Sequence, residues 1–464
     1  MEATIGIEVH VELISDAKVF SLSKNNFKDP VNTNINAIDL GHPGVLPRLN
    51  KGVIDAALKA CLALNCNINK VMHFDRKNYF YPDLPKGYQI TQQDTPIGYD
   101  GYINISNKKI DIERIHIEED TCKSIHTDYT LLNFNRAGVP LIEIVTRPCM
   151  KNGTEAMEYL EKLRETLLYL GVSDVKIEEG SMRCDVNVSV SNTDKLGTKV
   201  EVKNIGSIKN VGLAIDYEIK RQTDLINNGE VIKEQTRRFD DKTSTTVLMR
   251  YKETNSDYRY FPEPDIPYVI LTDEEIEQVK KTLPILGDEL RNKYKKLNIN
   301  DNAINTIISS RDICDFLESV IDECNPVIAA NLLTGDILSY LNKNIVSLDS
   351  TKLSKENFIK LVKALDKNII SSSSSKKIID IILENDKDVD LIIKENNMEQ
   401  ISDDSFIKEI ITKVISENPD SVKDYKEGKD RAIKYLMGQV MKEAHGKVNP
   451  SVSMQLLIKE LSNI

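Results

Sequence analysis

Carboxylate and imidazole side chains alternate with apolar ones in the segment TIGIEVHVEL, which begins at Thr4. Glu8, His10 and Glu12 are each separated from the next by a single valine. Successive residues of a β-strand point to opposite faces, so these three polar side chains would share one face. Oxygen and nitrogen groups gathered in this way can bind a metal ion. A solvated outer strand would show the same alternation, and this segment alone does not decide between the two.

The same alternation recurs in the segments RIHIEED (114–120), SMRCDVNVSV (181–190) and TKVEVKN (198–204). The polar residues on or beside the predicted face are His116, Glu118, Glu119, Asp120, Arg183, Asp185, Asn187, Lys199, Glu201 and Lys203. If the four strands are neighbours, about 4.8 Å apart, their carboxylates are crowded at unfavourable Coulomb energy. Mg²⁺ would relieve that crowding and keep coordination positions for a phosphate-bearing substrate.

These segments together favour a cleft that binds metal ions and a nucleotide. Arg183, Lys199 and Lys203 would bind the phosphates. The sequence contains neither G-x-x-x-x-G-K-[ST] nor G-x-G-x-x-G, so ATP would be held through metal ions and basic side chains rather than through a glycine-rich loop.

A second kind of chemistry is indicated by DRKNYFYPDLPKGYQITQ (75–92), which combines basic, aromatic and proline residues. The prolines exclude a regular helix, and consecutive aromatic residues cannot share one strand face. TRRFDDKTSTTVLMRYKE (236–253) and DYRYFPEPDIP (257–267) have a similar composition. Their arginines, which include Arg237, Arg238 and Arg259, could bind phosphate or the acceptor end of an RNA. A salt-bridge network at the surface is the alternative for each arginine.

Several classes of protein are not supported. No serine or cysteine lies in an activating motif, and none of the seven cysteines forms Cys-x-x-Cys. The net charge of −11 argues against a surface that coats nucleic acid along its whole extent. No apolar run approaches the roughly 20 residues of a membrane span, and no signal-peptide pattern opens the chain. We therefore expect a cytoplasmic protein without membrane contact.

The organisation of the chain changes near residue 290. Before that point, short alternating strands are mixed with helices such as GTEAMEYLEKLRETLLYLG (153–171). After it, apolar residues recur at helical spacing, and SSSSS (371–375) is typical of a turn followed by an N-cap. The sequence of residues 418–461 predicts three short helices joined by turns that contain Pro and Gly. We expect an α+β domain over 1–290 and all-helical domains over 291–404 and 405–464.

Nine long motifs between residues 6 and 267, together with a tenth near the end of the chain, resemble one known family. These motifs are GIEVHVEL, DRKNYFYPDLPKGYQITQ, IHIEEDTCKS, NRAGVPLIEIVT, EEGSMRCDVNVSV, VEVKNIGS, QTRRFDDKT, VLMRYKE, DYRYFPEPDIP and GQVMKEAHGKVNP. Their order and content are similar to the GatB/GatE family, the B subunits of the glutamyl/aspartyl-tRNA amidotransferases. The tail is similar to the family's C-terminal domain, which is shared with YqeY-like proteins.

The resemblance implies a fold, a reaction and partners. The N-terminal part would be a glutamine-synthetase-like cradle with a mainly antiparallel sheet. The protein would use ATP and Mg²⁺ to phosphorylate the side-chain carboxylate of Glu on tRNA(Gln) or of Asp on tRNA(Asn). Ammonia would then displace the phosphate, after release from glutamine by an amidase-type partner (GatA) and passage through a channel. A small third protein (GatC) would complete a heterotrimer, and the helical and tail domains would contact the tRNA.

The resemblance also implies roles for individual residues. The implied metal ligands are Glu8, His10, Glu118, Glu119, Asp185 and Glu201, of which Glu8, His10 and Glu119 are also implied to be catalytic, together with Lys77. The implied contacts to substrate, ATP or channel are Tyr79, Tyr81, Lys86, Arg183, Lys203, Arg237, Arg238 and Arg259. Lys77 would reach phosphate or the activated carboxylate, while Tyr79, Tyr81 and the prolines keep the wall of the passage rigid. A dry passage suits this chemistry, because water would hydrolyse an acyl phosphate.

The sequence departs from the family pattern in three places. Many members carry a cysteine zinc knuckle after the first strand, whereas residues 19–44 here contain no cysteine, so we expect no zinc. Thr121 and Cys122 stand where Ala-Gly is usual, and Arg147 and Cys149 stand where an acidic pattern is usual. We interpret Cys122 as a tolerated small residue rather than a nucleophile.

Two alternatives remain open from the sequence. A non-catalytic tRNA-binding scaffold is one, but a scaffold would have no need to gather carboxylates that repel RNA. A ligase acting on a free amino acid is the other, and the helical C-terminal third argues against it. Residues 405–464 carry ten Lys and Arg against eight Asp and Glu, a formal charge of +2, which favours tRNA contact in the tail.

Overall fold

The computed structural model describes residues 1–251, 258–400, 404–444 and 448–463. The chain divides into two compact units, Met1–Gly287 and Asp288–Ile464. Residues 252–257 and 445–447, which belong to three of the motifs quoted above, lie outside the described residues. None of the helices among the described residues is long and apolar enough to cross a membrane.

Nine strands of the described part of the first unit form one large sheet. In sheet order they are β14 (Thr245–Tyr251), β13 (Gln235–Asp240), β12 (Val200–Lys203), β11 (Met182–Ser191), β1 (Glu2–Glu12), β10 (Pro140–Thr146), β7 (Lys109–Glu119), β6 (Gly98–Asn104) and β2 (Asn67–Ile68). All neighbours pair antiparallel except β12 and β13, which are parallel. The predicted α+β class with a mainly antiparallel sheet is confirmed, while the likeness to glutamine synthetase stays a prediction.

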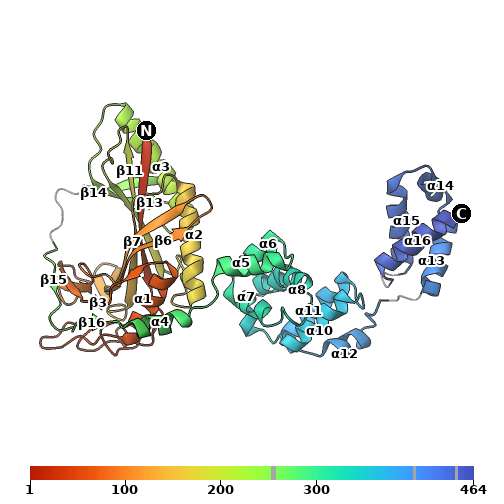
Figure 1. The fold of residues 1–464 in the computed structure, drawn as a ribbon, viewed down its shortest axis with the longest axis horizontal. Helices are drawn as coiled ribbons and strands as arrows, with labels where there is room; N and C mark the ends of the chain where they lie inside the picture. Colours follow the sequence, from red (N-terminus) through yellow and green to blue (C-terminus); the bar gives the residue numbers. More distant parts are fainter. Residues whose placement is uncertain (252–257, 401–403, 445–447, 464) are drawn as a thin grey trace. The chain divides into compact units, whose positions relative to one another are not determined.

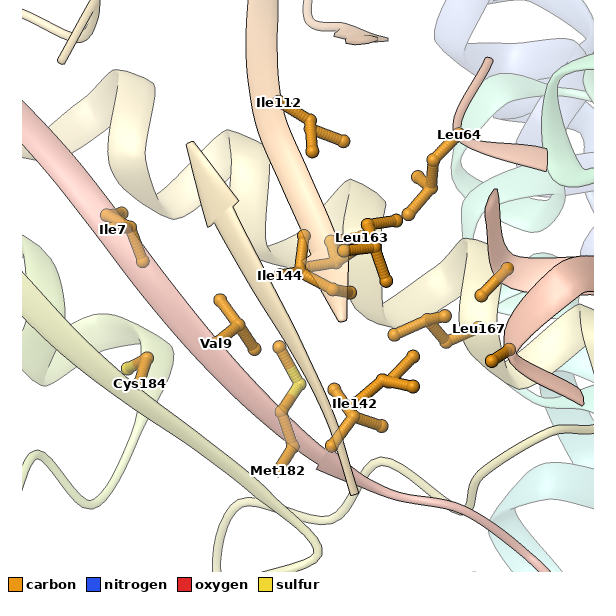
Figure 2. Packing of buried hydrophobic residues seen from close by; sticks show 14 of the residues in the cluster. Ile7, Val9, Leu64, Ile112, Ile142, Ile144, Leu163, Leu167, Met182 and Cys184 are labelled. Carbon is orange, nitrogen blue, oxygen red and sulfur yellow. The ribbon is translucent and has the colours of Figure 1, made fainter. Parts of the chain in front are cut away.

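One face of this sheet is apolar and is covered by helices. Ile7 and Val9 of β1 lie in the same buried cluster as Leu163 and Leu167 of α2 (Gly153–Leu170), as Figure 2 shows. The helices α1 (Lys51–Ala63) and α3 (Ile208–Asn227) add Leu58 and other residues to this cluster. Each fully buried side chain of this kind contributes roughly 1.5–3 kcal/mol. The opposite, polar face of the sheet is therefore the one available to a ligand.

Local sequence determines where these helices begin and how closely they pack. The side chains of Asn50, Asn152 and Ser207 accept backbone N–H groups at the starts of α1, α2 and α3. A Cβ at Gly153 would lie 2.6 Å from the carbonyl oxygen of Gly212. Glycine is therefore required where α2 approaches α3, and Figure 1 shows α2 running alongside the strands.

Short strands beside the large sheet hold the segment 75–92. β15 (Phe261–Pro262), β4 (Asp75–Asn78) and β5 (Tyr88–Thr91) form a three-stranded sheet. The pairs β16 (Val269–Ile270) with β3 (Val71–Met72) and β8 (Lys123–His126) with β9 (Thr130–Asn133) are separate. The aromatic and proline residues 79–87 thus form the connection of a hairpin, as the sequence predicts for a stretch that is neither helix nor buried strand.

After β16, the described residues form helices joined by turns and loops. α4 (Asp273–Lys281) belongs to the first unit, and the second unit contains α5 (Gly287–Lys296), α6 (Asp301–Ile308), α7 (Arg311–Glu318), α8 (Pro326–Leu332), α9 (Leu338–Asn344), α10 (Lys355–Asp366), α11 (Ser372–Asn385) and α12 (Val389–Glu395). A π-helical turn (Leu333–Ile337) precedes α9 and a 3-10 turn (Leu348–Ser350) follows it. The Ser371 hydroxyl accepts the N–H of Ser374, so the predicted serine N-cap is confirmed.

The tail has its own hydrophobic cluster. It contains α13 (Asp404–Glu417), α14 (Pro419–Lys426), α15 (Asp430–Glu443) and α16 (Pro450–Asn463). Ile411, Leu436 and Leu457 from three of these helices are fully buried together. The three short helices predicted over 418–461 are confirmed as α14, α15 and α16. The predicted domain boundaries stay predictions, and the one near 404 adjoins residues 401–403, outside the described residues.

Candidate active site

The register of β1 brings polar side chains of three strands together. Glu8 pairs with Asp185 of β11, and His10 pairs with Glu143 of β10. Residues directly opposite one another in a sheet share a face, so all four side chains lie on the polar side. The sheet therefore presents carboxylates and an imidazole along its centre, as the alternation in β1 and β11 predicts.

His10, Glu118 and Glu143 form a first group of possible metal ligands, called here the histidine group. Their ligand atoms all lie within 4.8 Å of one another. His10 Nε2 is 3.4 Å from Glu118 Oε1 and 3.7 Å from Glu143 Oε2. The buried His116 lies opposite Glu143 on the neighbouring strand β7, with its Nε2 3.0 Å from Glu143 Oε2. Three convergent N and O atoms suit a divalent cation.

Glu8, Asp185 and Glu201 form a second group, called here the carboxylate group. Their ligand atoms also lie within 4.8 Å of one another. The amide of Asn187 donates to Glu8 Oε1 over 2.9 Å, and the hydroxyl of Thr236 donates to Glu201 Oε2 over 2.9 Å. These bonds orient the carboxylates of Glu8 and Glu201. The Oδ1 atom of Asn187 is buried without a hydrogen-bond partner among the described residues.

The order of strands differs from the assumption that the four polar strands are direct neighbours. β12, β11 and β1 are adjacent, but β10 lies between β1 and β7. β10 supplies Glu143, which sequence reasoning missed. The signal was present: in PLIEIVT a single carboxylate interrupts a strand of branched apolar residues, with Ile142 and Ile144 on the buried face.

Burial and like charges act strongly on these carboxylates. Burial raises the pKa of Glu8, and the carboxylate of Glu143 raises it further. Burial also raises the pKa of Glu118, against the effect of His10. Despite its burial, Glu143 has a lowered pKa because His116 stabilises its charge. A bound cation would remove the repulsion that the protein side chains leave uncompensated.

Basic side chains border the two groups. Lys203 is ion-paired with Asp185 and has its Nζ 3.1 Å from Glu201 Oε1. Burial lowers the pKa of Lys203, but Asp185 and Glu201 together raise it above its usual value. Arg183 donates to Asp120 Oδ2 over 2.8 Å. Such lysine and arginine groups are suited to binding anionic oxygens.

A cleft of about 530 Å³ lies over this part of the sheet. Its lining includes His10, Glu118, Asp120, Arg183, Asp185, Lys203, Lys77, Tyr79 and residues 204–206. The volume is within the range of small-molecule sites. The predicted residues Lys77, Tyr79, Arg183 and Lys203 thus lie around one cavity with members of both ligand groups.

A second cavity of about 1080 Å³ adjoins the first. Both are lined by Lys77, Tyr79 and Thr121. The remaining lining of the second cavity is mainly aromatic or basic: Asn78, Phe80, Tyr81, Asp83, Arg250, Tyr258, Arg259 and Phe261. We call it the aromatic cavity. Exposed aromatic rings beside arginines form the kind of surface on which unpaired bases stack.

Lys77 stands between the two cavities. Its Nζ lies 4.9 Å from the centre of the Tyr258 ring and 5.9 Å from that of Tyr79. Although burial opposes its charge, the carboxylate of Glu118 raises the pKa of Lys77 above its usual value. For the Tyr79 hydroxyl, burial itself raises the pKa. Lys77 is therefore a cation at neutral pH. It lies beside two aromatic rings and lines both the cleft with the ligand groups and the aromatic cavity.

The hairpin that carries Lys77 is fixed by neighbouring charges. Arg76 binds Glu263 through two hydrogen bonds, Nε to Oε2 at 2.6 Å and Nη2 to Oε1 at 2.9 Å. The guanidinium also lies 4.2 Å from the centre of the Tyr88 ring. Bidentate pairs of this kind are the stronger class of side-chain hydrogen bond. They connect the motif DRKNYF with the motif FPEPDIP.

Glu119 belongs to neither ligand group among the described residues. Adjacent residues of a strand point to opposite sides, so Glu119 cannot follow Glu118 into the histidine group. It is ion-paired with Lys86, and its Oε1 accepts the N–H of Ile90 over 3.0 Å. Lys86 and Glu119 line a narrow cavity that shares Asp120 with the large cleft. The structure thus brings these two predicted residues together, but beside the ligand groups.

The three predicted arginines have different positions. Arg237 points away from the polar face: its Nε donates to Thr246 Oγ1 over 2.7 Å and lies 3.1 Å from Glu218. It connects β13 and β14 with α3. Arg238 pairs with Lys203 and shares its face, and it is exposed. Arg259 is exposed and lines the aromatic cavity, as does the predicted Tyr81.

The residues that depart from the family pattern have structural roles. In segment 19–44, the hydroxyls of Ser21 and Ser23 donate to the carboxylate of Asp39 over 2.7 and 2.5 Å. The fully buried Lys18 lies 3.6 Å from the same carboxylate. Burial raises the pKa of the Cys122 thiol to about 11, so this thiol is protonated at neutral pH and is a poor nucleophile.

Two family models match the chain. The profile of the GatB/GatE catalytic domain matches residues 3–277, and that of the GatB domain matches residues 315–461. The chain belongs to the GatB/GatE family. The resemblance stated from the motifs is therefore confirmed.

Similar proteins match over almost their whole length. The B subunit of the aspartyl/glutamyl-tRNA(Asn/Gln) amidotransferase from Geobacillus thermodenitrificans is 45% identical over 99% of both chains. The proteins of the same name from Oenococcus oeni and Lactococcus lactis subsp. cremoris are 44% and 45% identical. They match 99% and 100% of this chain and 98% and 99% of their own.

Proposed function

We propose that the protein is the component of a tRNA-dependent amidotransferase that activates and amidates Glu on tRNA(Gln), Asp on tRNA(Asn), or both. A carboxylate oxygen of the amino acid attacks the γ-phosphorus of ATP and ADP leaves. Ammonia then attacks the acyl carbon and phosphate leaves. The names of the relatives support the class of reaction. The geometry of the site supports the roles that we propose below for its residues.

The observation that carries the proposal is the pair of ligand groups on one face of the sheet. Glu8 and His10 belong to different groups but lie two residues apart on β1, roughly 6.8 Å along the strand. Each group could hold one cation, and both cations would then lie on the polar face over which a nucleotide would bind. Oxygen-rich ligands suit Mg²⁺, and the unpartnered Oδ1 of Asn187 is a further polar atom beside the carboxylate group.

Mg²⁺ would be held by Glu8, Asp185 and Glu201 and by His10, Glu118 and Glu143. When bound, Mg²⁺ supplies charge neutralisation to the phosphate oxygens. Arg183, Lys203 and Arg238 would bind and orient the phosphates from the same side. Together these groups would fix ATP with its γ-phosphate near Lys77.

Lys77 would position the amino-acid carboxylate. It lines both cavities, so it can reach a carboxylate whose tRNA end lies in the aromatic cavity. There Tyr81, Tyr258 and Arg259 would contact the terminal nucleotides by stacking and by charge. The raised pKa of Lys77 keeps it cationic toward the carboxylate throughout the neutral range.

The narrow cavity of Lys86 and Glu119 is our candidate for the entry of ammonia. It adjoins the cleft through Asp120, and its polar groups are paired with each other, which keeps its wall fixed. In this proposal Glu119 positions Lys86 and does not bind metal. Ammonia would come from glutamine through an amidase-type partner (GatA), with the small GatC protein in the complex, and the assembly would act in the cytoplasm.

The experiment that tests the proposal is reconstitution with an amidase-type partner. The complex is incubated with glutamine, ATP and Mg²⁺, and with Glu-tRNA(Gln) or Asp-tRNA(Asn) in separate reactions. We expect ATP-dependent formation of Gln-tRNA or Asn-tRNA in at least one of them. Failure of both, with glutaminase activity present, would refute the proposed activity.

A further inference from the structure

A third group of possible metal ligands lies outside the cleft. It consists of His73, in the connection between β3 and β4, Asp75, the first residue of β4, and Asp94, which follows β5. Their ligand atoms all lie within 4.8 Å of one another. None of these residues lines the two large cavities described above. The phosphate chemistry proposed for the cleft makes no use of them.

Two buried atoms of this group face each other without a hydrogen bond. His73 Nε2 lies 3.1 Å from Asp75 Oδ1, and the side chain of Asp75 is only 1% exposed. Among the described residues, neither atom has a partner in acceptable hydrogen-bond geometry. Burying polar atoms in this way is costly. A separation of 3.1 Å is also that of neighbouring ligands around an ion with bonds of about 2.1–2.2 Å.

The other polar atom of each buried ligand is already occupied. His73 Nδ1 lies 3.1 Å from the hydroxyl of Thr95, which fixes the ring and leaves Nε2 for a ligand. Asp75 Oδ2 accepts the backbone N–H groups of Gln93 and Asp94 over 2.7 and 3.2 Å, which leaves Oδ1. Metal-binding histidines and carboxylates are characteristically held by such outer contacts.

We propose that His73, Asp75 and Asp94 bind a divalent transition-metal ion, with water completing its coordination. One imidazole and two carboxylates, the donor set that the histidine group also offers, suit ions such as Mn²⁺ or Zn²⁺. Asp94 is exposed, so its carboxylate can turn toward the ion. With a single nitrogen ligand and an opening to solvent, this ion is removable by mild chelation, unlike the zinc of a cysteine knuckle.

The position of the site suggests its effect on the fold. Asp75 begins β4 and pairs with Thr91, near the end of β5, and Asp94 follows three residues later. An ion at this point joins the two ends of the hairpin that carries Lys77. The ion would therefore stabilise the two ends of the hairpin without taking part in the cleft.

The test uses Mn²⁺ as the probe on the full chain, with Mg²⁺ in large excess to fill the carboxylate group of the cleft. Bound Mn²⁺ is counted from the loss of the free-ion paramagnetic resonance signal. We expect at least one Mn²⁺ per chain that resists Mg²⁺, and one such ion that is lost in His73→Gln and retained in His10→Ala. Saturation should raise the Tm of the unmodified chain by on the order of 5 °C more than that of His73→Gln.

Three further variants make the result specific. His126→Gln is the matched control, because His126 Nδ1 also contacts a threonine hydroxyl, that of Thr130, but belongs to none of the ligand groups of the described residues. It should bind as many Mn²⁺ ions as the unmodified chain, and His10→Ala should retain the Mn²⁺ ion that His73→Gln loses. Asp94→Asn alters an exposed residue, so it should fold and bind Mn²⁺ at least tenfold more weakly. The proposal is overturned if Mg²⁺ displaces all Mn²⁺, if His73→Gln and Asp94→Asn bind like the unmodified chain, or if only His10→Ala loses the ion.

Discussion

Replacing Glu143 by Gln tests the residue of the histidine group that the strand pattern did not single out. The substitution keeps the shape of the side chain and its ability to accept from His116, whose Nε2 lies 3.0 Å away. It removes one negative charge from ligand atoms that lie within 4.8 Å of one another. The fold should persist, because Glu143 lies on the polar face and leaves the apolar cluster beneath the sheet unchanged.

The expected magnitude follows from the distances. A divalent cation within about 4 Å of the carboxylate would interact with it by about 4 kcal/mol for each unit of its charge at an effective dielectric constant of 20. The amide oxygen of Gln and the remaining ligands retain most of the binding, so we expect a loss of about 3 kcal/mol. This corresponds to a decrease of roughly 100-fold in the rate of ATP-dependent amidation, with a higher Mg²⁺ requirement.

The assay compares three rates in the reconstituted complex: amidated tRNA formed, ADP released and glutamine hydrolysed. Amidation and ADP release should fall together, while glutamine hydrolysis by the partner changes little. Glu113→Gln is the matched control, since Glu113 is an exposed carboxylate of the neighbouring strand β7 and belongs to no ligand group of the described residues. Amidation by Glu143→Gln at the unmodified rate and with the same Mg²⁺ dependence would refute the metal site.

Four other results are expected. Glu8→Gln or His10→Ala should reduce ATP-dependent amidation by orders of magnitude with glutaminase activity retained, and normal yields of amidated tRNA at saturating ATP would contradict the site. Deletion from residue 405 onward should weaken tRNA binding by roughly 1–3 kcal/mol in a filter-binding assay while the amidase partner still copurifies; unchanged affinity would exclude the tail from tRNA contact. Elemental analysis after mild chelation should find no stoichiometric zinc, and zinc that persists would contradict the inference from segment 19–44. Glu218→Gln should lower the free energy of unfolding by about 3–5 kcal/mol at pH 7, because it breaks a buried pair with Arg221 and Arg237. Despite burial, Arg221 lowers the pKa of Glu218 in the folded state, so this difference should shrink as the pH falls below the ordinary glutamate pKa; urea unfolding with the same difference at low pH would show that the charge is not responsible.

Strand faces could be predicted from the sequence because successive side chains of a strand point alternately to its two faces. That rule placed Glu8, His10, Asp185 and Glu201 on the polar side of the sheet, where the structure has them. It also separates Glu118 from Glu119, which the family resemblance had made metal ligands together, and it separates Arg237 from Arg238.

Strand order could not be predicted in the same way. The insertion of β10 between β1 and β7 depends on non-local pairing, and no local property of NRAGVPLIEIVT determines its neighbours. Glu143 therefore remained one carboxylate among many until its distance to His10 was known. The aromatic cavity could not be predicted for the same reason. Tyr79 and Tyr258 are far apart in the sequence, and only the fold brings the centres of their rings to 6.1 Å.

The pairing of β1 on both edges couples correct folding to the assembly of both candidate ligand groups. A slip of one residue against β11 and β10 would turn Ile7 and Val9 toward the solvent and bury Glu8 and His10 at the same time. A misregistered chain would thus lose its hydrophobic packing and both cation groups in a single step. Cation affinity can consequently serve as an assay of native register: preparations that contain misfolded protein should show fewer binding sites per chain, each of normal strength, rather than a full set of weakened sites.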